Sequence, residues 1–212
     1  MLKHTIHAVL AAAALGLSIH AGAALIVDTG VPVPLDPANP LQGDLALDAT
    51  DWLAGQIQVN NDVVVDSVKA WLNDQGNGGT QFMVALYADS GSNLPGALLE
   101  TGMGSFSAAS GTSAWSGASN LLWTLHAGQK YWVTFESDLS VDGFFGVAPV
   151  QAPNPLVRYA FNDGGFLGYQ PMTGANTGFG VQVASVPEPE SWQLFIAGMA
   201  LLMMVGRRAR TA

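Results

Sequence analysis

The chain has 212 residues, no cysteine and a formal net charge of −9. This length fits one globular domain with terminal appendages, and the absence of cysteine excludes a disulfide framework and any thiolate metal site. The compartment must therefore be inferred from the two ends of the chain.

Residues 1–23 have the pattern of a secretory signal peptide. They begin with Met1-Leu2-Lys3-His4, continue with an apolar run from Ala8 to Ile19 and end in the small residues Ala21-Gly22-Ala23-Ala24. A buried N-terminal helix is the alternative, but a charged start, a short apolar centre and an A-x-A site occur together here. We expect signal peptidase to cleave after Ala23 or Ala24, so that the body is exported.

Residues 24–186 form the predicted body, in which strand-length apolar runs alternate with clusters of Gly, Pro, Asn and Asp. This cadence predicts an all-β fold: an antiparallel β-sandwich, jelly-roll-like, flanked by an N-terminal signal helix and a C-terminal apolar helix. The predicted strands are Trp52–Val59, Val63–Leu72, Gln81–Ala88, Asn120–Leu125, Lys130–Glu136, Phe144–Ala148, Leu156–Phe161 and Phe179–Val183.

Alternation within Lys130–Glu136 shows how such a strand divides its side chains. Tyr131, Val133 and Phe135 share one face, and Trp132 and Thr134 share the other. Turns are predicted at residues 73–79 and at Leu94-Pro95-Gly96, while the proline-rich residues 31–40 are predicted to form an extended lead-in.

The body is strongly acidic. It contains three basic side chains, those of Lys69, Lys130 and Arg158, against fourteen acidic ones. Binding to phosphate needs clustered Lys and Arg, so nucleic acid is excluded as a partner and anionic lipid surfaces are disfavoured.

No catalytic motif stands out. His126 is the one histidine of the body, which excludes a histidine-based metal cluster. A Ser-His-Asp triad through His126 is arithmetically possible, but this residue lies in a predicted turn, where an exposed polar side chain is ordinary. Glycan hydrolysis by two carboxylates is the enzymatic alternative, although composition does not support it over turn-forming roles for the aspartates.

Two kinds of binding residue are candidates. Sugar rings stack on exposed aromatic faces, which makes Trp71, Trp132 and Tyr87 candidates for glycan stacking, with core packing as the ordinary alternative. No cofactor is required, but Ca²⁺ takes loop oxygens. Its weak candidate ligands are Asn73, Asp74 and Asn77, and a second group is Asp36, Asp44 and Asp48.

Residues 187–212 form a C-terminal signal. Pro187-Glu188-Pro189 precedes an apolar run from Trp192 to Val205, and Arg207 and Arg208 follow it. As a helix this run spans about 21 Å, short of a bilayer core of about 30 Å. The arginines would remain on the cytoplasmic side, which places the body outside. A generic anchor left in place is the alternative to a processed tail.

This tail resembles the PEP-CTERM sorting signal in its proline–glutamate–proline triplet, its spacing and its basic end. The resemblance covers about the last 27 residues. It implies handling by an exosortase-type transpeptidase in Gram-negative bacteria that make exopolysaccharide, with an inner-membrane intermediate before release to the cell surface or matrix.

A second resemblance lies in the body and supports the fold rather than an activity. Trp52–Ile57, Val84–Asp89, Leu94–Gly96 and Leu125–Trp132 are similar to the β-sandwich choice-of-anchor domains that precede surface-sorting tails. Together these patterns predict a non-enzymatic exported protein associated with exopolysaccharide or biofilm; a carbohydrate-binding module and, after it, a glycan hydrolase are the alternatives.

Overall fold

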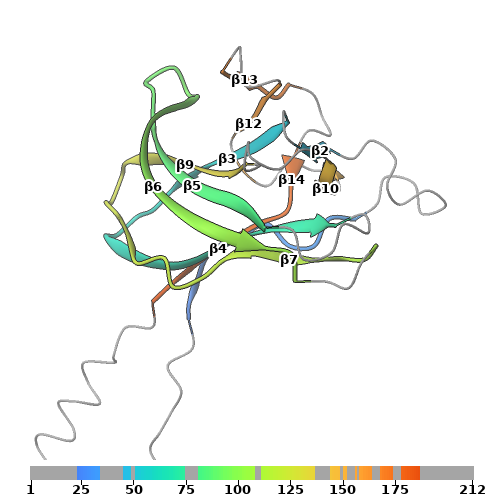
Figure 1. Ribbon diagram of the computed structural model, residues 1–212. Helices are drawn as coiled ribbons and strands as arrows, with labels where there is room; N and C mark the ends of the chain where they lie inside the picture. The colour runs from blue at the N-terminus through green and yellow to red at the C-terminus, as the bar shows by residue number, and fades with distance from the viewer. Residues whose placement is uncertain are drawn as a thin grey trace, which may run out of the picture. The chain divides into compact units, whose positions relative to one another are not determined.

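The body of the chain is all-β in a computed structural model (Figure 1). The structure describes residues 23–33, 45–48, 51–74, 81–107, 111–136, 144–148, 150–151, 156, 158–163, 168–173 and 178–186. All of these except Ala23 belong to one compact unit, Ala24–Val186. Both predicted terminal helices lie outside the described residues.

Fifteen strands occur in the described part of the chain. In chain order they are β1 (Leu25–Asp28), β2 (Leu45–Asp48), β3 (Trp52–Gln58), β4 (Val63–Asn73), β5 (Gln81–Asp89), β6 (Pro95–Ser105), β7 (Ser113–Ala118), β8 (Trp123–Leu125), β9 (Lys130–Glu136), β10 (Phe144–Ala148), β11 (Val150–Gln151), β12 (Tyr159–Asn162), β13 (Tyr169–Pro171), β14 (Gly178–Phe179) and β15 (Val181–Ser185).

Thirteen of these strands join one antiparallel sheet. Its main path runs β1-β15-β4-β7-β6-β5-β9-β3-β12-β13, with β8 and β10 paired to β4, and β2 paired to β10. Strands β11 and β14 form a separate two-stranded pair. The prediction of an all-β antiparallel fold is confirmed.

The two halves of this path enclose one core. Val68 of β4 and Val183 of β15 belong to the same buried cluster as Val84 of β5 and Phe135 of β9. The halves are linked through β6 and β7, which pair at Ser105 and Gly117 alone. In Figure 1 strands β4 and β7 run beneath β5 and β6. The sheet therefore curls so that its two halves pack against each other.

Register follows the predicted alternation of side chains. Tyr131, Val133 and Phe135 enter the main core, whereas Trp132 enters a second buried cluster on the opposite face with Ala54. Both faces of β9 are therefore buried.

Some predicted elements differ from the structure. The run Asn120–Leu125 is a strand only from Trp123, because Asn120 and Leu122 have φ near +60°, which is incompatible with a strand. The predicted turn at Leu94–Gly96 belongs to β6 from Pro95 onward, and the chain reverses earlier, where the Ser90 N–H donates to the Leu94 carbonyl over 2.9 Å.

The two ends of the body lie side by side. β1 pairs antiparallel with β15, and the Ser185 N–H donates to the Ala24 carbonyl over 2.9 Å. The Val186 N–H donates to the Val64 carbonyl of β4 over 2.8 Å. The chain therefore enters and leaves the body at one end of the sheet.

Candidate functional site

The turn between β8 and β9, residues 126–129, is held by several hydrogen bonds from distant parts of the chain. Gly128 has φ +75°, a conformation that favours glycine, and its N–H donates to the Val59 carbonyl over 2.9 Å. The Gln58 amide donates to the Gly128 carbonyl over 2.8 Å. The end of β3 and the residue after it therefore bond both the N–H and the carbonyl of this glycine.

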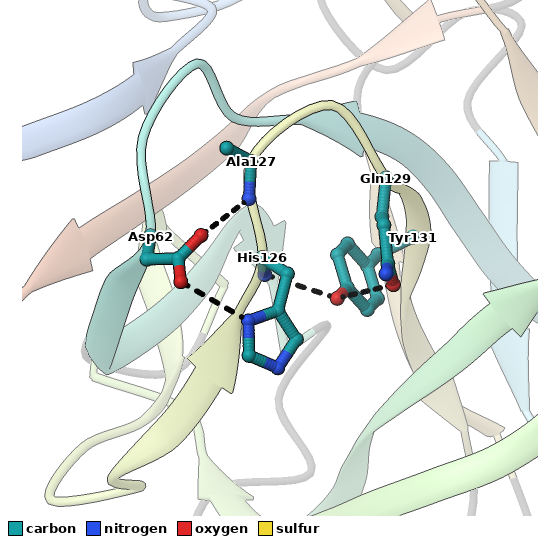
Figure 2. Close-up of polar contacts among 5 residues, drawn as sticks. All are labelled: Asp62, His126, Ala127, Gln129 and Tyr131. Carbon is teal, nitrogen blue, oxygen red and sulfur yellow. Dashed lines mark hydrogen bonds and ion pairs between the residues drawn. The ribbon is translucent and has the colours of Figure 1, made fainter.

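Asp62 fixes the first half of the turn (Figure 2). Its Oδ1 accepts the Ala127 N–H over 2.8 Å, and its Oδ2 lies 3.3 Å from Nδ1 of His126. These contacts, led by the Ala127 hydrogen bond, lower the pKa of the Asp62 carboxyl below its ordinary value. The carboxylate orients the imidazole, which remains 56% exposed.

Tyr131 fixes the turn from the β9 side. Its hydroxyl oxygen accepts the His126 N–H over 3.0 Å, and its O–H donates to Oε1 of Gln129 over 3.0 Å, as Figure 2 shows. The tyrosine is 4% exposed, so one buried phenol sets the backbone of His126 and the side chain of Gln129 together.

This turn forms one wall of an open groove of about 700 Å³. The opposite wall comes from the end of β5 and from β6, and Leu86 and Leu99 supply apolar surface. The lining residues with polar side chains are Asp89, Glu100, Thr124, His126, Gln129, Lys130 and Tyr131.

The carboxylate at the end of β5, that of Asp89, is already engaged in hydrogen bonds. Asp89 Oδ2 accepts Nε1–H of Trp132 over 3.0 Å and the Gln56 amide over 2.8 Å, and Oδ1 accepts the Gly91 N–H over 2.8 Å. Burial opposes ionisation of Asp89, but these hydrogen bonds, with Lys130 nearby, hold its pKa below the ordinary value. Asp89 is therefore a structural carboxylate of the groove wall.

The remaining polar groups of the groove are suited to hydrogen bonding with hydroxyl-rich ligands. Glu100 is an exposed acceptor, Lys130 is an exposed donor, and Thr124 and Gln129 can do both. Nζ of Lys130 donates to Oδ1 of Asn93 over 3.0 Å, which leaves further donor capacity on its ammonium group. Donors and acceptors around a partly apolar floor are typical of sites for polar small molecules and sugars.

Two enzymatic alternatives, a triad through His126 and glycan hydrolysis, can be compared with these contacts. The described polar partners of His126 are Asp62 at its ring, the Tyr131 hydroxyl at its backbone N–H and the Gln129 N–H at its carbonyl. Hydrolysis of a glycosidic bond uses two carboxyl groups; the groove holds those of Asp89 and Glu100, and Asp89 accepts three hydrogen bonds.

The three predicted stacking residues differ in their burial and in their aromatic neighbours. Trp132 is 0% exposed within the second buried cluster, so its ring offers no stacking face and that expectation is corrected. Tyr87 is partly buried, and its ring lies edge-on to Tyr169 at 6.0 Å. Trp71 is also partly buried and packs edge-on against Trp115 at 5.4 Å, so Trp71 and Tyr87 both combine partial exposure with an aromatic neighbour.

The predicted calcium ligands that are described hold the backbone instead. Asp74 Oδ1 accepts the Gly111 N–H over 2.7 Å, and the Asn73 amide donates to the Gly111 carbonyl over 3.1 Å. Asp48 Oδ1 accepts the Asp51 N–H over 2.9 Å. Asn77, Asp36 and Asp44 lie outside the described residues. Within the described ranges, no three His, Asp or Glu side chains group as metal ligands.

A second polar network was not anticipated from the sequence. Glu136, 1% exposed at the end of β9, accepts Thr134 Oγ1–H over 2.6 Å and the Tyr169 hydroxyl over 2.7 Å, and it also bonds the Tyr87 hydroxyl. Alternation places Glu136 on the face of Trp132, but no local signal links it to Tyr169, which is 33 residues away.

The sorting residues Pro187, Glu188, Pro189, Arg207 and Arg208 lie outside the described residues. In the part of the chain that the structure describes, no helix is both long and apolar enough to cross a membrane. No family model matches the chain, and a search of curated proteins gave no match.

Proposed function

We propose that this chain is an exported, non-enzymatic surface or matrix protein of a Gram-negative bacterium, whose body is a jelly-roll-like β-sandwich. Signal peptidase removes residues 1–23, and an exosortase-type transpeptidase processes the tail around Pro187-Glu188-Pro189. The product then serves exopolysaccharide or biofilm organisation at the cell surface.

The observation that carries this proposal is the pairing of β1 with β15. It brings Ala24, next to the predicted signal cleavage point, beside Ser185, two residues before the sorting triplet. Both processing points then flank a body that retains all fifteen described strands. Processing at either end therefore leaves the folded body whole.

The test is the intact mass and the terminal peptides of the protein from its native host, measured in membrane, surface and medium fractions. We expect surface material that lacks residues 1–23 and the tail beyond the triplet. Replacing Pro187, Glu188 and Pro189 with alanine should retain the tail in the membrane fraction, whereas replacing Pro32, a proline before the body's main strands, should leave processing unchanged. A retained tail in all wild-type fractions would contradict the proposal.

The groove beside the His126 turn favours one further role, binding of a neutral or mixed-charge glycan. Its donors and acceptors fit sugar hydroxyls, and its Leu86 and Leu99 surface fits apolar sugar edges. The proposed binding residues are therefore those of the groove and not Trp132, which is buried.

Calorimetric titration of the protein with oligosaccharides from the host exopolysaccharide tests this role. We expect Gln129→Ala combined with Glu100→Gln to weaken binding at least tenfold, while Trp71→Ala on the β4 strand leaves it unchanged. Loss of binding in Trp71→Ala with retention in the groove variant would instead assign the site to Trp71. Release of reducing sugar by the wild-type protein would favour the hydrolase alternative.

A further inference from the structure

Strand β6 has one open edge in the described part of the chain. On one side it pairs with β5 along its whole length, from Pro95 opposite Asp89 to Ser105 opposite Gln81. On its other side the one described strand pair is Ser105 with Gly117. The main-chain donors and acceptors that point away from β5 between Pro95 and Gly104 therefore have no described strand partner. An unpaired edge of this length is a template for another extended strand.

The side chains of β6 do not protect this edge. Leu98, Leu99 and Met103 are 52%, 46% and 57% exposed. Natural edge strands are usually blunted by several charges or an inward lysine, and β6 carries one charged residue, Glu100. Pro95 protects only its first position.

The regular part of the edge lies at its C-terminal half. The pairing with β5 shifts register between Leu86 and Tyr87 and again between Tyr87 and Asp89, so bulges interrupt β6 before Glu100. From Glu100 to Ser105 each residue faces one β5 residue in unbroken register. No bulge interrupts this stretch, and its residues Glu100–Gly104 precede Ser105, which already pairs with Gly117.

We propose that a second copy of this chain adds its own β6 to this edge, forming an antiparallel pair about a two-fold axis. With the axis at Gly102, each Glu100 faces Gly104 of the other copy and each Thr101 faces Met103. Opposed glutamates are avoided, and Met103 gains an apolar contact on its exposed face. A two-fold pair of identical edges closes on itself, as isologous interfaces do.

Charge favours this edge over the rest of the body for contact between copies. The body carries fourteen acidic and three basic side chains, so two copies repel each other over most orientations. Along Glu100–Gly104 each copy brings one carboxylate to the contact. The partner must be an extended, nearly uncharged strand, and β6 itself has this character.

The test compares the full-length chain with two single lysine substitutions at exposed apolar residues. Met103→Lys places a charge on the edge, and Leu122→Lys, at a residue 68% exposed in the segment between β7 and β8, is the matched control. Sedimentation over a concentration series should show a dimer for the wild type and Leu122→Lys, and an association constant at least tenfold lower for Met103→Lys. Equal melting temperatures verify that both variants fold.

Hydrogen exchange distinguishes strand addition from other association. We expect amides of the peptide covering residues 97–104 to exchange more slowly at high protein concentration in the wild type, and not in Met103→Lys. A wild-type monomer at all concentrations, an equal loss in Leu122→Lys, or association without added protection of this peptide, as contact through the apolar tail would give, overturns the proposal.

Discussion

The two faces of β9 are equally buried but are stabilised differently. On the inner face, Phe135 packs edge-on against Phe179 at a ring distance of 5.9 Å and lies 6.4 Å from Phe82. On the outer face, Trp132 and Glu136 are also almost fully buried, but each is held by hydrogen bonds. Burial alone therefore does not distinguish a face stabilised by apolar area from one stabilised by satisfied polar partners.

This difference determines how much stability a substitution on each face should cost. Removing apolar volume from the inner face leaves a cavity whose cost grows with the volume removed. Removing one partner from the outer face leaves buried donors or acceptors without a bond, and the cost depends on how many are left.

The largest effect is expected at the inner face. Phe135→Ala should destabilise the protein by about 4 kcal/mol, because it removes a fully buried ring from the centre of the core. Urea unfolding followed by tryptophan fluorescence measures this change. Leu98→Ala, on the exposed edge strand, is the control and should change stability by no more than about 0.5 kcal/mol.

A smaller loss is expected when the outer face loses an acceptor. Asp89→Ala should cost about 3 kcal/mol, because the buried Trp132 Nε1–H and Gln56 amide both lose their acceptor. In a double-mutant cycle with Trp132→Phe, the double variant should lose less stability than the two single variants lose in sum, because both substitutions remove the same hydrogen bond. Full additivity would mean that Asp89 acts independently of the indole.

The stability of the protein at alkaline pH tests the tyrosines that cover the outer face. Burial, with Glu136 nearby, raises the pKa of Tyr169 well above its ordinary value, and the pKa of Tyr87 is raised for the same reasons. These groups contribute stability below the unfolded pKa of about 10, and this contribution is lost as pH rises above that value.

Tyr169→Phe should therefore reduce the slope of stability against pH between about 9 and 11, while costing about 1.5 kcal/mol at neutral pH through the lost bond to Glu136. Urea unfolding at several pH values measures both quantities. An unchanged alkaline slope would show that Tyr169 ionises as easily in the folded as in the unfolded chain.

The smallest effect is expected at the exposed turn, which contrasts with both buried faces. The pKa of Asp62 is lowered by the Ala127 hydrogen bond and by His126, so its contribution is present above the unfolded pKa of about 4 and is lost as pH falls through the lower folded pKa. Asp62→Asn should lower the melting temperature slightly at pH 6, and this difference should shrink at pH 3. A difference independent of pH would contradict a role for the ionised carboxylate.

The sequence was most informative where one strand carries a clear alternation. Lys130–Glu136 and Phe144–Ala148 have the predicted bounds, and Gln81–Asp89 differs by one residue. Strand β6 was missed, because Gly96, Gly102 and Gly104 remove the apolar alternation that marks a strand. These glycines fit tight packing instead: a Cβ at Gly104 would lie 2.7 Å from the Phe82 ring.

The groove was less predictable than the fold, because its walls come from distant parts of the chain. Glu100 and Lys130 have no local pattern that places them together, and their proximity depends on β5 pairing with both β6 and β9. The burial of Trp132 likewise depends on Tyr169, which packs against its cluster from a strand more than thirty residues later. Alternation assigned Trp132 to a face but gave no sign of what covers that face.

The antiparallel pairing of β1 with β15 also has a mechanical consequence. Ala24 and Val186 leave the sheet at the same end, so tension applied between them opens the β1–β15 hydrogen bonds one after another instead of loading them all at once. Tension applied through Val186 alone passes instead into β15, which lies between β1 and β4. A body held only by its C-terminal end therefore carries load through paired strands on both sides, whereas one held by both ends would begin to peel open at β1.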